Sequence, residues 1–150
     1  MVKALAVYDS MFGNTEKIAK ALAAGLESGG VDVDIVKVGA VKFDDLDKID
    51  LLCVGSPVHG WGPSEPIKEF LERLKSVQGL SGKKAFAFDT KMKSRLAGSA
   101  GGKIERKLKD AGYTIVRSSE SAIVRGREGP LEESAERTFK QIGAELAKMS

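Results

Sequence analysis

The first loop that could do chemistry reads "DSMFGNT" (9–15). It offers the hydroxyls of Ser10 and Thr15, the amide of Asn14 and a flexible turn at Gly13, and an alanine-rich helical pattern follows at once. The first N–H groups of a helix lack partners within it, and the helix dipole favours negative charge there. The loop therefore predicts an anion site, and a phosphate is the ligand that we expect there. The competing interpretation is that Asn14 or Thr15 only caps the helix.

A second loop, "GSPVHGWGP" (55–63), contains the one histidine and the one tryptophan of the chain. Gly60 and Gly62 allow the backbone to approach a ligand, and an indole beside them can stack on a planar ring. We expect Trp61 to take that role rather than to lie in the core. His59 stays open between a proton donor and a surface residue, because no carboxylate in the sequence evidently pairs with it.

The sequence lacks the residues that several other kinds of site require. The sequence shows no Ser/His/Asp set, no metal-binding cluster and no nucleophile elbow. The loop at 9–15 lacks the three glycines of a dinucleotide site and the lysine of a P-loop. "AGSAGGKI" (97–104) approaches a P-loop, but it lacks the first glycine and the final Ser/Thr. We therefore expect no catalytic residue and no metal.

Positive charge is concentrated in one segment. Between Lys91 and Lys109 lie seven of the 24 basic residues and one of the 21 acidic ones, in a chain of net charge +3. One interpretation is a solvated helix face preceded by a polar loop. The other is a docking surface, at Lys91, Lys93 and Arg95, for an acidic partner or an anionic substrate. No aromatic residues are interleaved with the cations, which argues against a nucleic-acid partner.

The elements that must position these loops alternate along the whole chain. Near-continuous apolar runs predict strands buried on both faces, an alternating run predicts a strand nearer an edge, and two short runs could be pieces of a last strand. These strands are expected at 4–8, 51–55 and 85–88, at 31–38, and at 113–116 with 122–124. Apolar stripes at helical spacing predict helices between them, the last opened by Pro130.

This alternation predicts one doubly wound α/β domain, 1–150, with a mostly parallel sheet. Ligands of such sheets bind at the carboxyl ends of the strands, so the loops at 9–14, 56–62 and 89–97 should meet. No apolar run is long enough to span a membrane, and the apolar run at the N-terminus is too short for a signal peptide. Cys53 has no partner for a disulfide and is expected to be a buried, inert thiol.

Two segments resemble the flavodoxin family. "YDSMFGNTEKIA" is similar to the phosphate-binding loop of flavodoxins, of pattern Thr/Ser-x-Thr-Gly-x-Thr. Ser10, Gly13 and Thr15 match that pattern, and Phe12 stands where a hydroxyl is usual. "GSPVHGWGP" resembles the loop that wraps the flavin ring. The combination of "YDSM" and "GSP" is most similar to the flavodoxin domain of flavodiiron proteins.

The resemblance implies a three-layer sandwich with a five-stranded parallel sheet of order 2-1-3-4-5 and a non-covalent FMN. It implies a small electron carrier between redox partner proteins. From the sequence we expect a cytoplasmic protein that binds no nucleic acid and no membrane, as a monomer or weak homodimer. The phosphate would lie on the first loop, and the ring would contact the second loop and the start of the third. These residues are Ser10, Met11, Phe12, Gly13, Asn14 and Thr15, then Pro57, Val58, His59, Gly60, Trp61, Gly62, Thr90 and Lys91.

The third loop departs from the family. Flavodoxins are usually acidic there, whereas this loop carries Lys91, Lys93 and Arg95 and has no aromatic residue between Phe88 and Tyr113. Nearby cations favour reduced, anionic flavin, so we expect a raised reduction potential. Two alternatives to the carrier are an FMN-dependent NAD(P)H reductase of quinones or similar acceptors, and a binding module that has lost its flavin.

Overall fold

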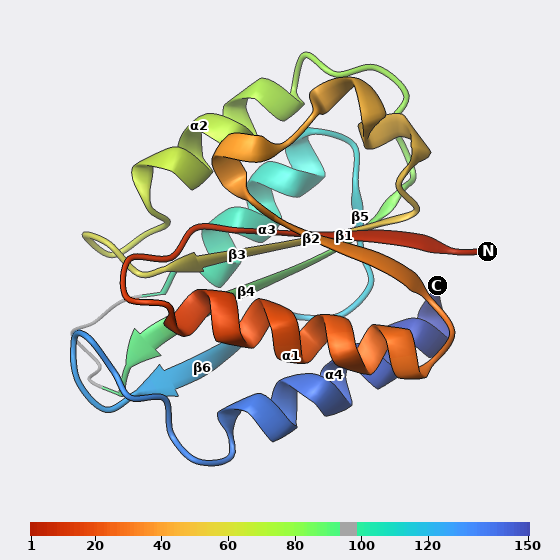
Figure 1. Ribbon diagram of the computed structural model, residues 1–150. Coiled ribbons are helices and arrows are strands. Elements are labelled where there is room, and N and C mark those ends of the chain that lie inside the picture. Colours follow the sequence, from red (N-terminus) through yellow and green to blue (C-terminus); the bar gives the residue numbers. More distant parts are fainter. Residues whose placement is uncertain (94–98) are drawn as a thin grey trace.

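The computed structural model describes residues 1–93 and 99–150 (Figure 1). Arg95 of the basic loop and residues 97–98 of the P-loop-like segment therefore lie outside the described part of the chain. The strands are β1 (Lys3–Tyr8), β2 (Asp32–Lys37), β3 (Leu51–Pro57), β4 (Lys84–Met92), β5 (Thr114–Ile115) and β6 (Glu120–Val124). The α-helices are α1 (Asn14–Ser28), α2 (Glu65–Leu74), α3 (Gly101–Asp110) and α4 (Ala135–Met149), and two 3-10 helices, Val38–Ala40 and Phe43–Lys48, follow β2.

The sheet has the expected order, β2-β1-β3-β4-β5, and its strands are parallel. β5 and β6 both pair with β4, β5 near its start and β6 near its end. The two short apolar runs are thus two pieces that continue one edge of the sheet, as the sequence suggested. α1 and α4 cover one face and α2 and α3 the other, which gives the three-layer sandwich (Figure 1).

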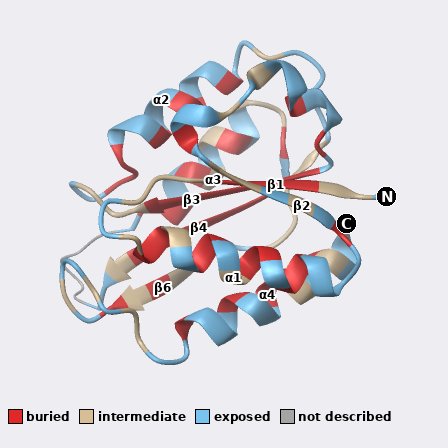
Figure 2. Cartoon of the chain, in the orientation of Figure 1, coloured by how far each residue is buried: buried red, intermediate tan, exposed pale blue. Residues whose placement is uncertain are grey.

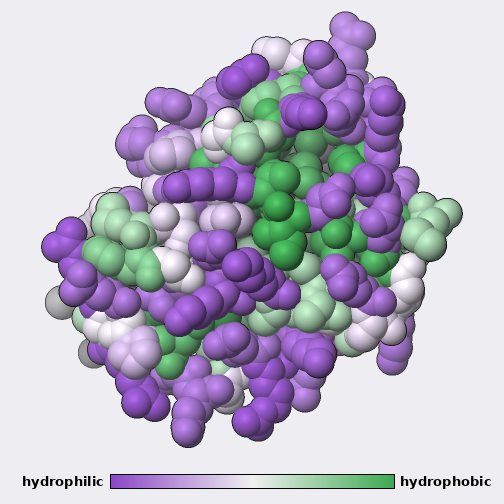
Figure 3. Space-filling view, viewed as in Figure 1, coloured by the Kyte–Doolittle hydropathy of each residue, from purple (hydrophilic) through white to green (hydrophobic). Residues whose placement is uncertain are grey.

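The core lies on both faces of the sheet (Figure 2). Because side chains alternate along a strand, Leu52 and Val54 of β3 pack toward α2 and α3, while Leu51 and Cys53 pack toward α1 and α4. Covering both faces explains why the central strands read as continuous apolar runs. β2 is an edge strand, and its Val33, Ile35 and Val36 are only partly buried. In the same view, apolar side chains gather over this region, with polar side chains around them (Figure 3).

α1 is held against α4 by a close approach of the two backbones. A Cβ added at Gly25 of α1 would collide with the backbone of Lys140, and one added at Gly143 of α4 would collide with the backbone of Leu22. Glycine at both positions lets the helices touch without intervening side chains. This packing fixes the axis of α1, whose first turn belongs to the site.

The start of the last helix differs from the sequence prediction. α4 begins at Ala135, so Pro130 does not open it. Leu131 instead forms an antiparallel bridge with Val124, and the backbone N–H of Arg125 donates to the carbonyl of Pro130 at 2.9 Å. These backbone bonds fold residues 125–131 into a turn at the end of β6, which local sequence patterns do not encode. Among the described helices, none has the length and apolar character needed to cross a membrane.

Candidate functional site

The first loop joins the end of β1 to the first turn of α1. Gly13 occupies the N-cap position with φ +88°, and no side chain caps the helix from there. Ser10 Oγ accepts a hydrogen bond from the Gly13 N–H at 3.0 Å, which closes the loop. Asn14 and Thr15 are buried in the first turn, so neither occupies the N-cap position. The loop thus presents N–H groups and hydroxyls at the positive end of a helix, a donor set that suits a phosphate.

Two side-chain contacts tie this first turn to distant loops. Thr15 Oγ1 lies 2.7 Å from Thr90 Oγ1 at the end of β4, and this contact is buried. Asn14 Nδ2 donates to the backbone carbonyl of Glu128, in the turn after β6, at 3.1 Å. The start of α1 is therefore the point at which three separate loops are held together.

The second loop forms a tight turn. The His59 N–H donates to the Gly62 carbonyl at 2.8 Å, and the Gly62 N–H donates to the His59 carbonyl at 3.1 Å. The two central residues have positive φ, +54° at Gly60 and +73° at Trp61, as in a type I′ turn. The Val58 N–H donates to the Thr90 carbonyl at 3.2 Å, which joins the loop to β4. This bond places His59 beside the end of β4, the strand that leads into the third loop.

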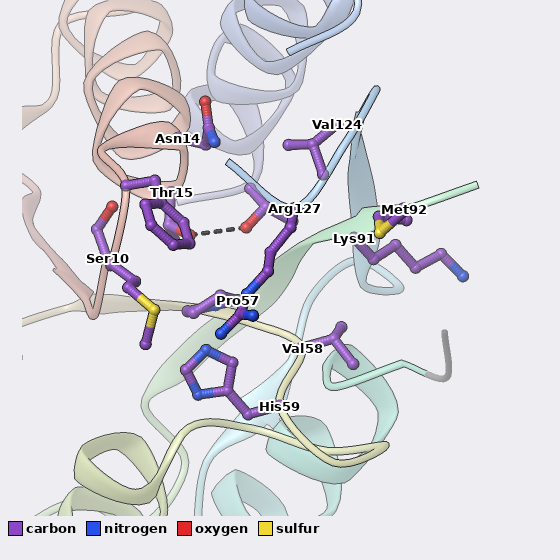
Figure 4. Close-up of a pocket in the computed structure, with 13 residues that line it drawn as sticks. Ser10, Asn14, Thr15, Pro57, Val58, His59, Lys91, Met92, Val124 and Arg127 are labelled. Atoms are coloured by element: carbon purple, nitrogen blue, oxygen red, sulfur yellow. Dashed lines mark hydrogen bonds between the residues drawn. The ribbon is translucent and has the colours of Figure 1, made fainter. Parts of the chain in front are cut away.

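A cavity of about 270 Å³ opens where these loops meet. Ten of the fourteen predicted site residues line it: Ser10, Met11, Phe12, Asn14, Thr15, Pro57, Val58, His59, Thr90 and Lys91. Gly13, Gly60, Trp61 and Gly62 lie in the same loops but outside the lining. His59, not Trp61, is the ring of the second loop that faces the cavity (Figure 4).

Three lining residues were missed by the sequence analysis: Met92, Val124 and Arg127. Arg127 comes from the turn after β6, and its guanidinium reaches into the cavity toward Pro57 and His59 (Figure 4). The sequence does hold a signal, the alternation of arginine and glycine in "VRGREGP" (124–130), typical of a turn rather than a helix start. Lys91 and Arg127 make the lining cationic, and no Asp or Glu is among its residues.

In β4, next to Thr90, the carboxylate of Asp89 is fully buried. Its Oδ2 accepts hydrogen bonds from Ser99 Oγ at 3.0 Å and from the N–H groups of Ala100 and Gly101, both at 2.9 Å. A negative group at a helix N-terminus is stabilised by the helix dipole. Asp89 therefore fixes the start of α3 to the strand that carries Thr90 into the cavity. Oδ1 has no partner among the described residues.

The geometry combines an anion site with a partly apolar slot. Hydroxyls, an amide and the free N–H groups of α1 suit a phosphate, while Pro57, Val58 and Val124 offer apolar surface for a planar group. No group of three or more His, Cys, Asp or Glu side chains in the described part of the chain could hold a metal ion.

Comparison with known proteins agrees with this geometry. The flavodoxin family model matches residues 7–142. This chain belongs to the flavodoxin family. It is 35% identical over 111 residues to a putative diflavin flavoprotein of Nostoc, a match covering 71% of this chain and 19% of that protein. It is 33% identical over 91 residues to a probable flavodoxin of Bacillus subtilis, covering 59% of this chain and 56% of that one. The matches thus span less than two thirds of either relative.

Solved structures show the same fold. A flavodoxin from the Archaea superposes with a TM-score of 0.83 at 26% identity, covering 99% of this chain and 98% of that one. The flavodiiron protein of Giardia intestinalis superposes with a TM-score of 0.80 at 20% identity, covering 97% of this chain and 35% of that one. The chain is an FMN-binding flavodoxin domain, and the donor set of the cavity suits that cofactor.

Proposed function

We propose that this flavodoxin-family chain works as a small electron carrier between redox partners. Bound FMN supplies the electron chemistry, and the protein holds and tunes it. The observation that carries the proposal is the Thr15–Thr90 hydrogen bond, because it joins the phosphate-type loop and the ring-type loops around one cavity.

Within this proposal the first loop binds the phosphate. Ser10, Asn14 and Thr15 supply polar side chains, and Gly13, with its positive φ, gives the turn that leads into the first N–H groups of α1. Phe12, which stands in place of a hydroxyl, lies beside Arg127 in a neighbouring hollow.

The ring-binding residues in our proposal are those that face the cavity. Pro57, Val58 and His59 form one wall, and Thr90, Lys91 and Met92 form the other. This assignment gives the ring contact of the second loop to His59.

The cationic lining also supports an acidic redox partner. Lys91 lines the cavity and Lys93, two residues on, is exposed. Cations around the mouth speed the approach of an acidic protein, and salt screens the effect. We expect the second-order rate of electron transfer to an acidic partner to fall as ionic strength rises, and an unchanged rate would count against this docking mode.

Anaerobic reduction of the FMN-loaded protein tests the carrier against the reductase. A carrier should be reduced readily by dithionite, whereas NAD(P)H alone should act at least a hundredfold more slowly. Fast, saturable reduction by NAD(P)H together with quinone turnover would favour the reductase instead. The matched control is free FMN at the same concentration.

We also propose that residues 1–150 act as one domain in the cytoplasm, as a monomer or weak homodimer. A buried, unpaired thiol at Cys53 fits a reducing compartment. Sedimentation of the purified protein and fractionation of the host cell test these two points separately.

A further inference from the structure

A fourth loop reaches the cavity, besides the three that the sequence analysis singled out. It is the turn of residues 125–131, all of which the structure describes, and Arg127 is the residue of this turn that lines the cavity. The guanidinium points toward Pro57 and His59 of the second loop (Figure 4). Arg127 therefore reaches the loop that our proposal assigns to the flavin ring.

One side chain fastens this turn to the first helix. Asn14 Nδ2 donates at 3.1 Å to the carbonyl of Glu128, the residue that follows Arg127. The contact is close, because a Cβ added at Gly129 would stand 3.0 Å from both Nδ2 and Oδ1 of Asn14. Asn14 is buried, which shields this bond from water. The amide of Asn14 therefore sets the position from which Arg127 enters the cavity.

The guanidinium of Arg127 supplies a flat surface that the third loop does not. The residues that reach the lining from the end of β4 are Thr90, Lys91 and Met92, and none of them carries a planar group. A guanidinium is planar, delocalised and weakly hydrated, so it stacks on aromatic rings, which a lysine ammonium cannot do. No Asp or Glu is among the lining residues to form an ion pair with Arg127 there. Its flat face can therefore contact a planar ligand.

We propose that the turn 125–131 is a fourth flavin-binding loop, in which the Arg127 guanidinium contacts the flavin ring and Asn14 is the positioning residue. His59 and Arg127 then supply planar groups to the ring site from two different loops. Asn14 acts on the ring through Arg127, in addition to its place in the first loop. The inference rests on the FMN site of the proposed function and not on the choice between carrier and reductase.

The test titrates flavin-free protein with FMN and with riboflavin, which lacks the phosphate, and follows the quenching of flavin fluorescence. The variants are Arg127→Lys, which keeps the charge, Arg127→Gln, which removes it, Asn14→Ala, and the double variant of Asn14→Ala with Arg127→Gln. The matched control is Arg125→Lys, in the same turn but outside the cavity lining. Both arginines are exposed, so these replacements leave the core intact.

The two Arg127 variants should weaken riboflavin and FMN by the same factor, about fivefold, because the lost contact is to the ring that both flavins share. Arg125→Lys should leave both affinities unchanged. The visible absorption band of bound riboflavin should shift in Arg127→Lys and stay in place in Arg125→Lys, since that band reports the surroundings of the ring.

Asn14→Ala should weaken riboflavin about threefold, although riboflavin has no phosphate for the first loop to hold. The same change should have no further effect on riboflavin in the Arg127→Gln background, because Asn14 acts on the ring through Arg127. Equal losses of riboflavin affinity from Asn14→Ala in both backgrounds would refute the positioning role.

Weaker FMN binding with unchanged riboflavin binding in Arg127→Gln would place the guanidinium on the phosphate and overturn the proposal. Wild-type affinity in Arg127→Lys would also overturn it, since charge alone would then account for the effect. Failure of the proposed cofactor site gives a different result: the wild type would leave both flavins free in solution, which removes the site and this inference with it.

Discussion

Thr15 and Thr90 stand 75 positions apart in the sequence, yet their hydroxyl oxygens lie 2.7 Å apart in a buried contact. The contact joins the first turn of α1 to the end of β4, and so joins the two loops on which the proposed cofactor site depends. Neither residue carries a local sequence signal for the other. Their hydrogen bond is the structural reason that an anion site and a ring site share one cavity.

Replacing either threonine by valine keeps the shape and leaves the other hydroxyl buried without this partner. Thr15→Val and Thr90→Val should each lower the free energy of unfolding by about 1–2 kcal/mol. The double variant should lose less than the sum of the two, because the second change removes the orphaned hydroxyl. Urea unfolding measures these values, with the exposed Thr138→Val of α4 as control. Simple additivity would show that the pair does not interact.

The Asp89 carboxylate is expected to be the main anchor of α3. Asp89→Ala removes the acceptor of three hydrogen bonds at a helix N-terminus, and we expect a loss of about 2–3 kcal/mol in unfolding free energy. Asp89→Asn keeps one acceptor oxygen and should lose less. The control is Asp110→Ala at the exposed far end of the same helix, expected to change stability by less than about 0.5 kcal/mol. Equal stabilities for Asp89→Ala and this control would refute the anchoring role.

Arg127 should raise the reduction potential of bound FMN. By Coulomb's law a unit charge about 8 Å away at an effective dielectric of about 20 contributes about 2 kcal/mol, and solvent exposure reduces this to roughly 1 kcal/mol. Arg127→Gln should therefore lower the two-electron potential by about 20 mV. Lys91→Gln should act in the same direction.

The control for this electrostatic prediction is Arg125→Gln, in the same turn but outside the cavity lining. Redox titration with indicator dyes gives the potentials at low and at moderate salt. A shift as large for Arg125→Gln as for Arg127→Gln would mean that only net charge matters. Such a result would contradict the placement of Arg127 beside the ring.

Cys53 should behave as an inert thiol below about pH 9. Burial raises its pKa from 9.0 to about 12, and the reactive species of a cysteine is the thiolate. The native protein should therefore resist iodoacetamide at pH 8, while the urea-unfolded chain reacts at an ordinary rate. Because the folded state holds the proton more tightly, this group's contribution to stability is complete below pH 9 and is lost as pH rises toward 12. Rapid labelling of the native protein would contradict this burial.

The fold could be predicted from the sequence because the patterns that indicate its strands and helices are local. Near-continuous apolar runs at 51–55 and 85–88 exist since both faces of the sheet are covered, and glycines end the helices where the patterns stop. The first loop was equally accessible, since a hydroxyl-rich turn before a helix has a physical meaning of its own. Most of the cavity lining follows from these two facts.

What the sequence did not reveal depends on tertiary contacts. Pro130 fits a helix start as well as a turn, and only the bridge between Val124 and Leu131 decides for the turn that carries Arg127. Trp61 between two glycines fits a stacking residue, but in the structure it is His59 and not Trp61 that lines the cavity. Contacts that form only in the folded chain cannot be predicted from a local sequence pattern.

The most direct test of the account is a titration of flavin-free protein with FMN and, separately, with riboflavin, followed by quenching of flavin fluorescence. If the first turn of α1 holds the phosphate and His59 faces the ring, FMN should bind one to one and riboflavin, which lacks the phosphate, at least tenfold more weakly. Unquenched FMN, or equal affinity for the two flavins, would contradict the site proposed here.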